Sequence, residues 1–179
     1  MSKKTLSVKW LCPLVFVLGL VLDQLTKWLV VKYMALYQSI PVIKDVIHIT
    51  YIRNKGAAFG MLAEHRWVFL ILSGVTIVAV GIYLFFTKNN SPLYLVSLSM
   101  ILSGGVGNMI DRIALGEVID FIDFTLIDFA IFNGADSFVC VGAALFFLSV
   151  VLDEVKVEKE KRAKISAPTE EKNDDSLGG

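Results

Sequence analysis

Four aspartates lie within or beside apolar segments of the chain, at Asp23, Asp111, Asp120 and Asp136. An ionisable group near hydrocarbon is costly, so by default it marks a functional site. Asp120 and Asp136 are of most interest, because each ends or opens an apolar segment inside a distinctive motif. Two carboxylates brought together at a membrane boundary could share one proton and hold a water molecule between them. That chemistry would hydrolyse a peptide bond in or beside a membrane.

The sequence around these two aspartates predicts different environments for them. Asp120 is followed by Phe121 and Ile122, and desolvation in such a setting raises the pKa of a carboxyl group. Asp136 follows Asn133 at the start of the last apolar segment, where a helix dipole favours a negative charge. A simple helix N-cap is the structural alternative for Asp136. An interacting pair would titrate as a unit.

The other two aspartates have basic neighbours at helical spacing. Asp23 and Lys27 are four residues apart, so they lie on one helical face and can pair. We interpret this pair as structural. Asn108, Asp111 and Arg112 share one face after a glycine-rich run. Asp111 could orient Arg112, whose fork of donors suits a carboxylate or a peptide carbonyl. The alternative is a tight helix interface.

The sequence offers little support for metal binding, a serine nucleophile, phosphate binding or nucleic-acid binding. His48 and His65 are the only histidines, and neither stands at ligand spacing from a cysteine or a carboxylate. Cys12 and Cys140 are far apart in the chain. No serine lies in a nucleophile elbow, and no phosphate-binding loop follows a strand. The net charge of +0 implies no general attraction to nucleic acid. We therefore expect no metal, no cofactor and no nucleic-acid partner.

Hydropathy predicts a membrane protein. The chain is 55% hydrophobic, with a mean hydropathy of +0.67, which is more apolar than a soluble domain of this length. We predict an all-α integral membrane domain at 1–155. For the charged cytoplasmic tail at 156–179 we expect a frayed helix end followed by disorder. Alternating Val, Ile, Thr and Tyr at 42–53 predict a small extracytoplasmic β-sheet between the first two helices. The predicted spans are 10–32, 67–87, 93–112 and 136–153, with the β region at 36–62.

The charge distribution predicts the orientation. Four spans place both termini on one side of the membrane. Lysines before the first span, in the second connection and in the tail favour cytoplasmic termini, although the opposite side also carries basic residues. No small-residue cleavage site follows Leu22, so we expect the first span to be retained rather than removed as a signal peptide. The acidic pair would then face the extracytoplasmic side.

Five motifs make the chain resemble the bacterial lipoprotein signal peptidases (signal peptidase II). Each motif is weak alone, but all five in this order on a four-span pattern are specific, and they cover about 10–152. The motifs are Asp-Gln-Leu-Thr-Lys at 23–27, Asn-Lys-Gly-Ala-Ala-Phe-Gly at 54–60, Gly-Gly-Val-Gly-Asn-Met-Ile-Asp-Arg at 104–112, Val-Ile-Asp-Phe at 118–121 and Phe-Asn-Gly-Ala-Asp-Ser at 132–137.

The resemblance implies an aspartic endopeptidase of the bacterial cytoplasmic membrane. Such an enzyme removes the signal peptide of lipid-modified prolipoproteins just before the diacylglyceryl-cysteine. The resemblance implies Asp120 and Asp136 as the catalytic pair, metal-independent chemistry and inhibition by the lipodepsipeptide globomycin. We expect a monomer surrounded by membrane lipid. The supporting or substrate-binding residues that it implies are Asp23, Lys27, Asn54, Gly56, Asn108, Asp111, Arg112, Asn133 and Ala135. Gly134 departs from the family pattern, in which a larger aliphatic residue is common.

Two other functions explain parts of the sequence. In a proton-conducting protein or small transporter the four aspartates would form a relay through the membrane depth, but here they cluster toward one face. In a non-enzymatic scaffold the glycines at 104–107 would form a dimer face, which leaves the motifs around Asp120 and Asp136 unexplained.

Overall fold

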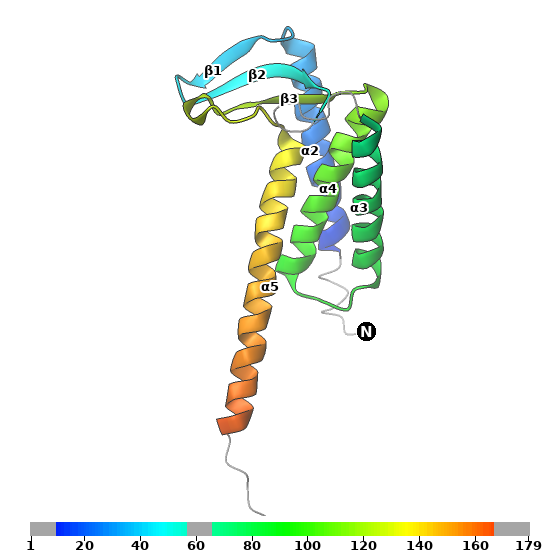
Figure 1. The fold of residues 1–179 in the computed structure, drawn as a ribbon, viewed down its shortest axis with the longest axis vertical. Coiled ribbons are helices and arrows are strands. Elements are labelled where there is room, and N and C mark those ends of the chain that lie inside the picture. The colour runs from blue at the N-terminus through cyan, green and yellow to red at the C-terminus, as the bar shows by residue number, and fades with distance from the viewer. Residues whose placement is uncertain (1–9, 57–65, 167–179) are drawn as a thin grey trace, which may run out of the picture.

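The computed structural model describes residues 10–56 and 66–166, and it places a bundle of helices against one face of a small sheet (Figure 1). The sheet lies across one end of the bundle, and the last helix extends well past the other end. The helices are α2 (Leu11–Tyr33), α3 (Arg66–Phe86), α4 (Pro92–Ala114) and α5 (Gly134–Ser166). The strands are β1 (Ser39–Ile43), β2 (Ile47–Asn54) and β3 (Val118–Asp123), followed by the short 3₁₀ helix η2 (Thr125–Ile127).

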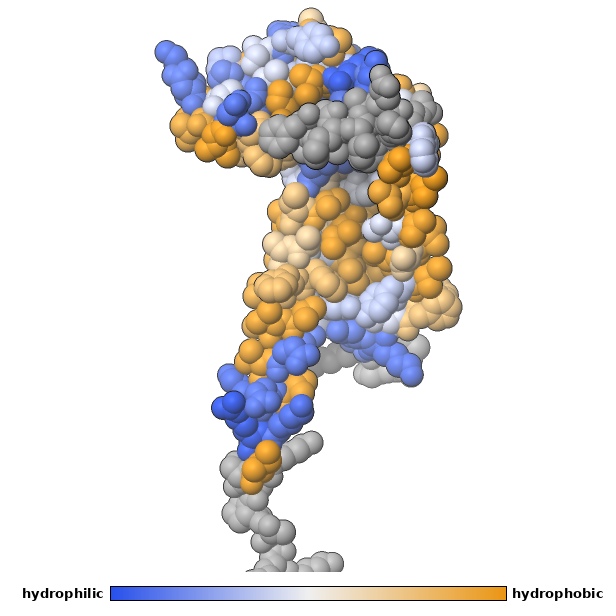
Figure 2. Space-filling view, viewed as in Figure 1, coloured by the Kyte–Doolittle hydropathy of each residue, from blue (hydrophilic) through white to orange (hydrophobic). Residues whose placement is uncertain are grey.

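The helices have the composition of membrane spans. Within the described residues, α2, α4 and the 134–163 part of α5 are long and apolar enough to cross a membrane, whereas the apolar part of α3, Leu70–Phe86, is shorter. Large apolar side chains such as Leu18, Val75 and Phe147 are more than half exposed. Figure 2 shows hydrophobic residues covering the visible face of the bundle, while the far end of α5 is mainly hydrophilic. Such a surface matches lipid rather than water.

Helix α4 lies at the centre of the bundle and packs against α2, α3 and α5. Small residues allow these close approaches. A Cβ added to Gly104 would collide with the carbonyl oxygen of Ala135, and one added to Gly107 would lie 2.5 Å from Asp23 Oδ2. Where glycines remove the side chain, helix backbones can approach closely. This packing brings the end of α4 against both α2 and the start of α5.

The three strands form one antiparallel sheet in the order β1-β2-β3. The small sheet that the sequence predicted is present, but its third strand comes from the connection between α4 and α5 rather than from the region between the first two helices. The run from Val118 to Asp123 pairs with β2, and Ile52 is the partner of Asp120. Four apolar side chains form the core under the sheet, Val30, Tyr51, Ile119 and Phe121. An alternating pattern marks a strand but does not identify its partner, so the pattern at 42–53 did not assign β3.

The charged segment after Lys156 continues the last helix. We expected a frayed helix end followed by disorder from about 156, and α5 continues to Ser166. Lysine and glutamate are good helix formers, and Glu158 pairs with Arg162 one turn later over 2.9 Å. Such a segment therefore extends an existing helix although it buries no core. The rest of the predicted tail, His65, and the 57–60 part of the second motif lie outside the described residues.

Changing Gly104 to Ala tests the close packing of α4. We expect Gly104→Ala to destabilise the protein by about 1–3 kcal/mol, because the new methyl group overlaps the backbone of α5. Gly81→Ala is the matched control, since a Cβ there meets nothing within 4 Å. Thermal unfolding in detergent measures both variants. Equal midpoints for the two variants would contradict the packing described here.

Candidate active site

Asp120 is a buried carboxylate held by two asparagine amides. It lies in β3 and is 2% exposed. Asn54, at the end of the neighbouring strand, donates from Nδ2 to Asp120 Oδ2 over 2.9 Å. Asn133, just before α5, donates from Nδ2 to Asp120 Oδ1 over 2.7 Å. Each carboxylate oxygen therefore receives a hydrogen bond from a different segment of the chain.

Asp136 lies in the first turn of α5 and has two roles. Asn133 Oδ1 accepts a hydrogen bond from Asp136 N over 3.0 Å, and Asp136 Oδ2 accepts one from Asn133 N over 3.2 Å. This reciprocal arrangement is a capping box, in which Asn133 is the N-cap residue and Asp136 completes the cap from within the first turn. The second oxygen, Asp136 Oδ1, accepts from Asn108 Nδ2 of α4 over 2.7 Å. Asp136 thus starts the helix with one oxygen and faces α4 with the other.

Burial raises the pKa of Asp120 to about 6. The negative charge of Asp136 raises this pKa further, whereas the hydrogen bonds from Asn54 and Asn133 and the charge of Lys27 lower it. Desolvation outweighs the donors because the carboxylate has almost no access to water. Asp120 therefore holds a proton more readily than an ordinary aspartate does.

The remaining two aspartates surround a buried lysine. Lys27 is 1% exposed, and its Nζ lies 2.9 Å from Asp23 Oδ2 and 2.8 Å from Asp111 Oδ2. The same Nζ donates to Asn108 Oδ1 over 3.0 Å. Asp23 Oδ1 accepts a hydrogen bond from Ala135 N over 2.8 Å, which satisfies a free N–H at the start of α5. These contacts join α2, α4 and α5 just beside Asp136.

The structure gives Asp111 and Arg112 different surroundings. The predicted Asp23–Lys27 pair is present, but Asp111 also binds Lys27, a contact that the sequence analysis did not predict. We expected Asp111 to serve mainly as the partner that orients Arg112. Asp111 Oδ2 also accepts from Ile119 N over 3.3 Å, which ties α4 to β3. Arg112, by contrast, lines the cavities described next.

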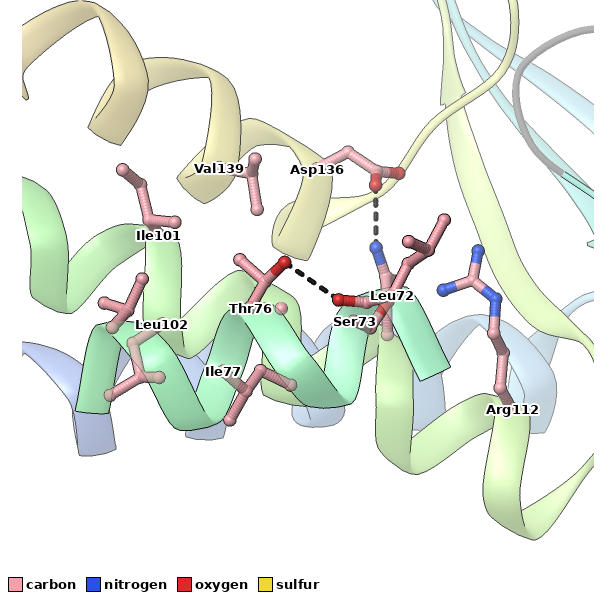
Figure 3. Close-up of a pocket in the computed structure, with 12 residues that line it drawn as sticks. Leu72, Ser73, Thr76, Ile77, Ile101, Leu102, Arg112, Asp136 and Val139 are labelled. Carbon is pink, nitrogen blue, oxygen red and sulfur yellow. Dashed lines mark hydrogen bonds between the residues drawn. The ribbon is translucent and has the colours of Figure 1, made fainter. Parts of the chain in front are cut away.

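Two cavities meet at Asp136. The first has a volume of about 400 Å³ and lies between α3, α4 and α5, with a wall of mostly apolar side chains such as Leu72, Ile77 and Val139 (Figure 3). The second has a volume of about 420 Å³ and contains Asp120. Three residues line both cavities, Asn108, Arg112 and Asp136. In Figure 3 the Arg112 and Asp136 side chains lie at the same end of the first cavity.

The structure brings the predicted site residues into one region. Gly56 belongs to it because its N–H donates to Asn54 Oδ1 over 2.9 Å. Within the described part of the chain, no group of three or more His, Cys, Asp or Glu side chains is placed to hold a metal ion. Of the predicted site residues, those that line the second cavity are Asn54, Gly56, Asn108, Arg112, Asp120 and Asp136. Asp23, Lys27, Asp111 and Ala135 belong to the cluster around Lys27. Asn133 joins the two groups through its hydrogen bonds to Asn108 and Asp120.

Sequence reasoning missed two parts of the site. Gln24 donates from Nε2 to Asp23 Oδ2 and Asp111 Oδ1, each over 3.1 Å, and so ties the two carboxylates together. Gln24 lies inside the first motif, and this position could have identified it as a site residue from the sequence. Residues 129–131 and Cys140 form part of the wall of the second cavity. Nothing local in the sequence marks them, because they reach the site only through the fold.

The fold and the site are those of a protein with membrane-length apolar helices and two carboxylates, Asp120 and Asp136, in the wall of one cavity. Comparison with known proteins identifies the family. The chain matches the family model for signal peptidase (SPase) II over residues 15–152, and it belongs to this family of aspartic peptidases. The resemblance proposed from the motifs is therefore confirmed.

Individual relatives match over most of their length. The lipoprotein signal peptidase of Brevibacillus brevis is 48% identical over 135 residues, which cover 75% of this chain and 91% of the relative. That of Bacillus subtilis is 45% identical over 141 residues, which cover 78% of this chain and 92% of the relative. A solved structure described as a bacterial membrane enzyme superposes with a TM-score of 0.75 at 33% identity, and covers 80% of this chain and 88% of its own.

The raised pKa of Asp120 predicts a pH-dependent difference in stability between the wild type and Asp120→Asn. Between pH 3.8 and about 6 the folded protein holds a proton on Asp120 that the unfolded chain has lost. The stability of the wild type relative to Asp120→Asn therefore falls as the pH rises through this window, by roughly 3 kcal/mol in total. The measurement is the free energy of unfolding of both proteins in detergent at several pH values. A difference that is constant with pH, or that grows with pH, would contradict a raised pKa.

Proposed function

We propose that this protein is the peptidase that removes signal peptides from lipid-modified prolipoproteins, with Asp120 and Asp136 as its catalytic dyad. The single observation that carries the proposal is that both carboxylates line one cavity and that asparagine amides hold each of them. Membership of the signal peptidase II family and relatives named lipoprotein signal peptidases support the substrate class.

In this proposal the dyad works with one proton shared between the two carboxyl groups. The ionised aspartate takes a proton from water as the water oxygen attacks the carbonyl carbon of the scissile bond. The protonated aspartate gives its proton to the carbonyl oxygen, which forms a tetrahedral intermediate. This intermediate collapses as the aspartate that took the proton from water gives it to the leaving nitrogen, while the other aspartate takes a proton back from a hydroxyl of the intermediate. We assign the shared proton to Asp120, since burial raises its pKa to about 6.

The two cavities support a division of the substrate. We propose that the apolar cavity between α3, α4 and α5 takes hydrocarbon of the lipid-modified substrate, because its wall offers mainly aliphatic side chains. The second cavity would hold the peptide around the scissile bond, next to Asp120. Arg112 lines both cavities, and its guanidinium is suited to hold a peptide carbonyl oxygen there. Cleavage just before the diacylglyceryl-cysteine would follow from holding the lipid and the peptide at once.

The placement in the membrane completes the proposal. We propose that α2, α3, α4 and α5 all span the cytoplasmic membrane, with α3 as the shortest span. Residues 1–155 would form the membrane domain, with both termini in the cytoplasm and the dyad toward the extracytoplasmic face. The sheet and the far end of α5 lie at opposite ends of the molecule (Figure 1), and that end of α5 carries Lys156, Lys159 and Lys161. One chain supplies every residue of the dyad and its asparagines, so a monomer suffices.

Removing either carboxylate tests the dyad. Asp120→Asn and Asp136→Asn should each lower the cleavage rate by roughly 100- to 10,000-fold, because each removes one member of the acid–base pair. The assay measures signal peptide released from a purified diacylglyceryl-modified prolipoprotein. Asp123→Asn, in the same strand, is the control, because an asparagine can still accept the hydrogen bond from Thr50 Oγ1. If either dyad variant cleaves at the wild-type rate, the assignment is wrong.

The apolar cavity predicts a requirement for the lipid on the substrate. The same prolipoprotein without its diacylglyceryl group should be cleaved with a kcat/KM at least about tenfold lower, because the lost hydrocarbon burial weakens its binding. The experiment compares the two forms at equal concentration in the same detergent. Equal turnover would show that the cavity does not bind the lipid. Competition by globomycin, which the family resemblance implies, is measured in the same assay.

A further inference from the structure

Asn54, Asn108 and Asn133 face the proposed dyad. In each of them the side-chain N–H group donates to a carboxylate, and the side-chain oxygen accepts from a donor whose position is fixed. Asn54 Oδ1 accepts from the backbone N–H of Gly56 over 2.9 Å. Asn133 Oδ1 accepts from the backbone N–H of Asp136 over 3.0 Å. Because a backbone N–H can only donate, the oxygen of each amide must face it. The amide nitrogen of each then faces a carboxylate.

Asn108 follows the same rule, but its donor is a side chain from another helix. Its Oδ1 accepts from Lys27 Nζ over 3.0 Å and from Asn133 Nδ2 over 3.0 Å. An ammonium group has three hydrogens and no acceptor, and Lys27 has three acceptors within 3.0 Å, the other two being Asp23 and Asp111. A reversed Asn108 amide would place its N–H groups against this ammonium and its oxygen against Asp136. Both contacts would be repulsive.

The geometry points to Lys27 as a positioning residue for the reaction, which acts by fixing the orientation of the Asn108 amide so that its N–H group faces Asp136. This inference rests on the proposed role of Asp136 in catalysis. Lys27 is well suited to this role because Asp23 and Asp111 balance its charge. These three residues and Asn108 are all buried from water. Without Lys27, the carboxylate of Asp23 attracts N–H groups in its place. The Asn108 amide then keeps only the hydrogen bond from Asn133 Nδ2 to hold its direction toward Asp136.

The test needs variants that remove the donor without changing the buried charge. Lys27→Met/Asp111→Asn removes one positive and one negative charge, so the cluster keeps the net charge that it has in the wild type. Asp111→Asn alone retains Lys27 and differs from the double variant only at residue 27, so it is the reference for loss of the donor. The wild type has the same net cluster charge as the double variant and is the reference for the effect of charge. Lys27→Gln/Asp111→Asn is a second version in case the methionine protein does not fold. Because the glutamine side chain is one atom shorter than lysine, its amide does not reach Asn108 Oδ1.

The first readout is structural and needs no peptidase activity. Proteins with isotope-labelled asparagine are compared by NMR in detergent micelles, after a check that each unfolds cooperatively. The side-chain N–H protons of Asn108 should exchange slowly with water in Asp111→Asn and at least about tenfold faster when Lys27 is also replaced. Unchanged exchange in a folded double variant overturns the proposal.

The second readout is kinetic and separates positioning from general stability. Relative to Asp111→Asn, the double variant should lose roughly 10- to 100-fold in kcat while KM changes by less than about threefold. Adding Asn108→Ala to the double variant should cost clearly less kcat than Asn108→Ala costs in Asp111→Asn, since the loss of Lys27 has already removed part of the same effect. Additive losses, or a change confined to KM, overturn the proposal. If the wild type itself fails to cleave the prolipoprotein, the proposed function fails while the amide exchange still decides the role of Lys27.

Discussion

A single buried ammonium connects the helices of this protein to its site. Lys27 binds Asp23 on its own helix, and Asp111 and Asn108 on α4. Asp23 in turn accepts a hydrogen bond from the second residue of α5. A charge without partners inside an apolar bundle is strongly unfavourable, so these contacts must form together. Since the three helices meet at this point, the positions of Asn108 and Asp136 depend on it.

Nearly all the polar side chains around Asp120 and Asp136 form hydrogen bonds with one another. Asn133 caps α5 with its Oδ1 and uses both hydrogens of its amide on Asn108 and Asp120. Asp136 likewise serves the helix start with one oxygen and Asn108 with the other. A buried network in which every group has a partner is rigid. Rigidity of this kind suits a hydrolytic site, because carboxylates must keep their separation while a water molecule reacts between them.

Glycine and alanine make this closeness possible. Gly104 and Gly107 leave room for the start of α5 and for the Asp23 carboxylate, and Ala135 is fully buried at the same crossing. The motif that read as a possible dimer face is therefore an internal contact between helices of one chain. On the other side of α4, the apolar cavity toward α3 reaches Asp136. The bundle is thus closely packed where α4 meets α2 and α5, and it has a cavity where α4 faces α3. Binding of a hydrocarbon chain next to the proposed dyad would require such a cavity.

The sequence by itself determined the membrane character, the helices, the two hairpin strands and the family, because hydropathy, alternation and motifs are local patterns. Motifs also singled out Asp120 and Asp136 among four aspartates of similar surroundings. Only the tertiary structure decided that residues 118–123 form the third strand, that Asn133 is the N-cap residue of α5, and that Asp111 binds Lys27. These contacts join residues far apart in the chain, 81 positions for Lys27 and Asn108 and 112 for Asp23 and Ala135. Periodicity within a segment carries no information about which distant segment it meets, since that choice depends on packing and on pairing of buried charge.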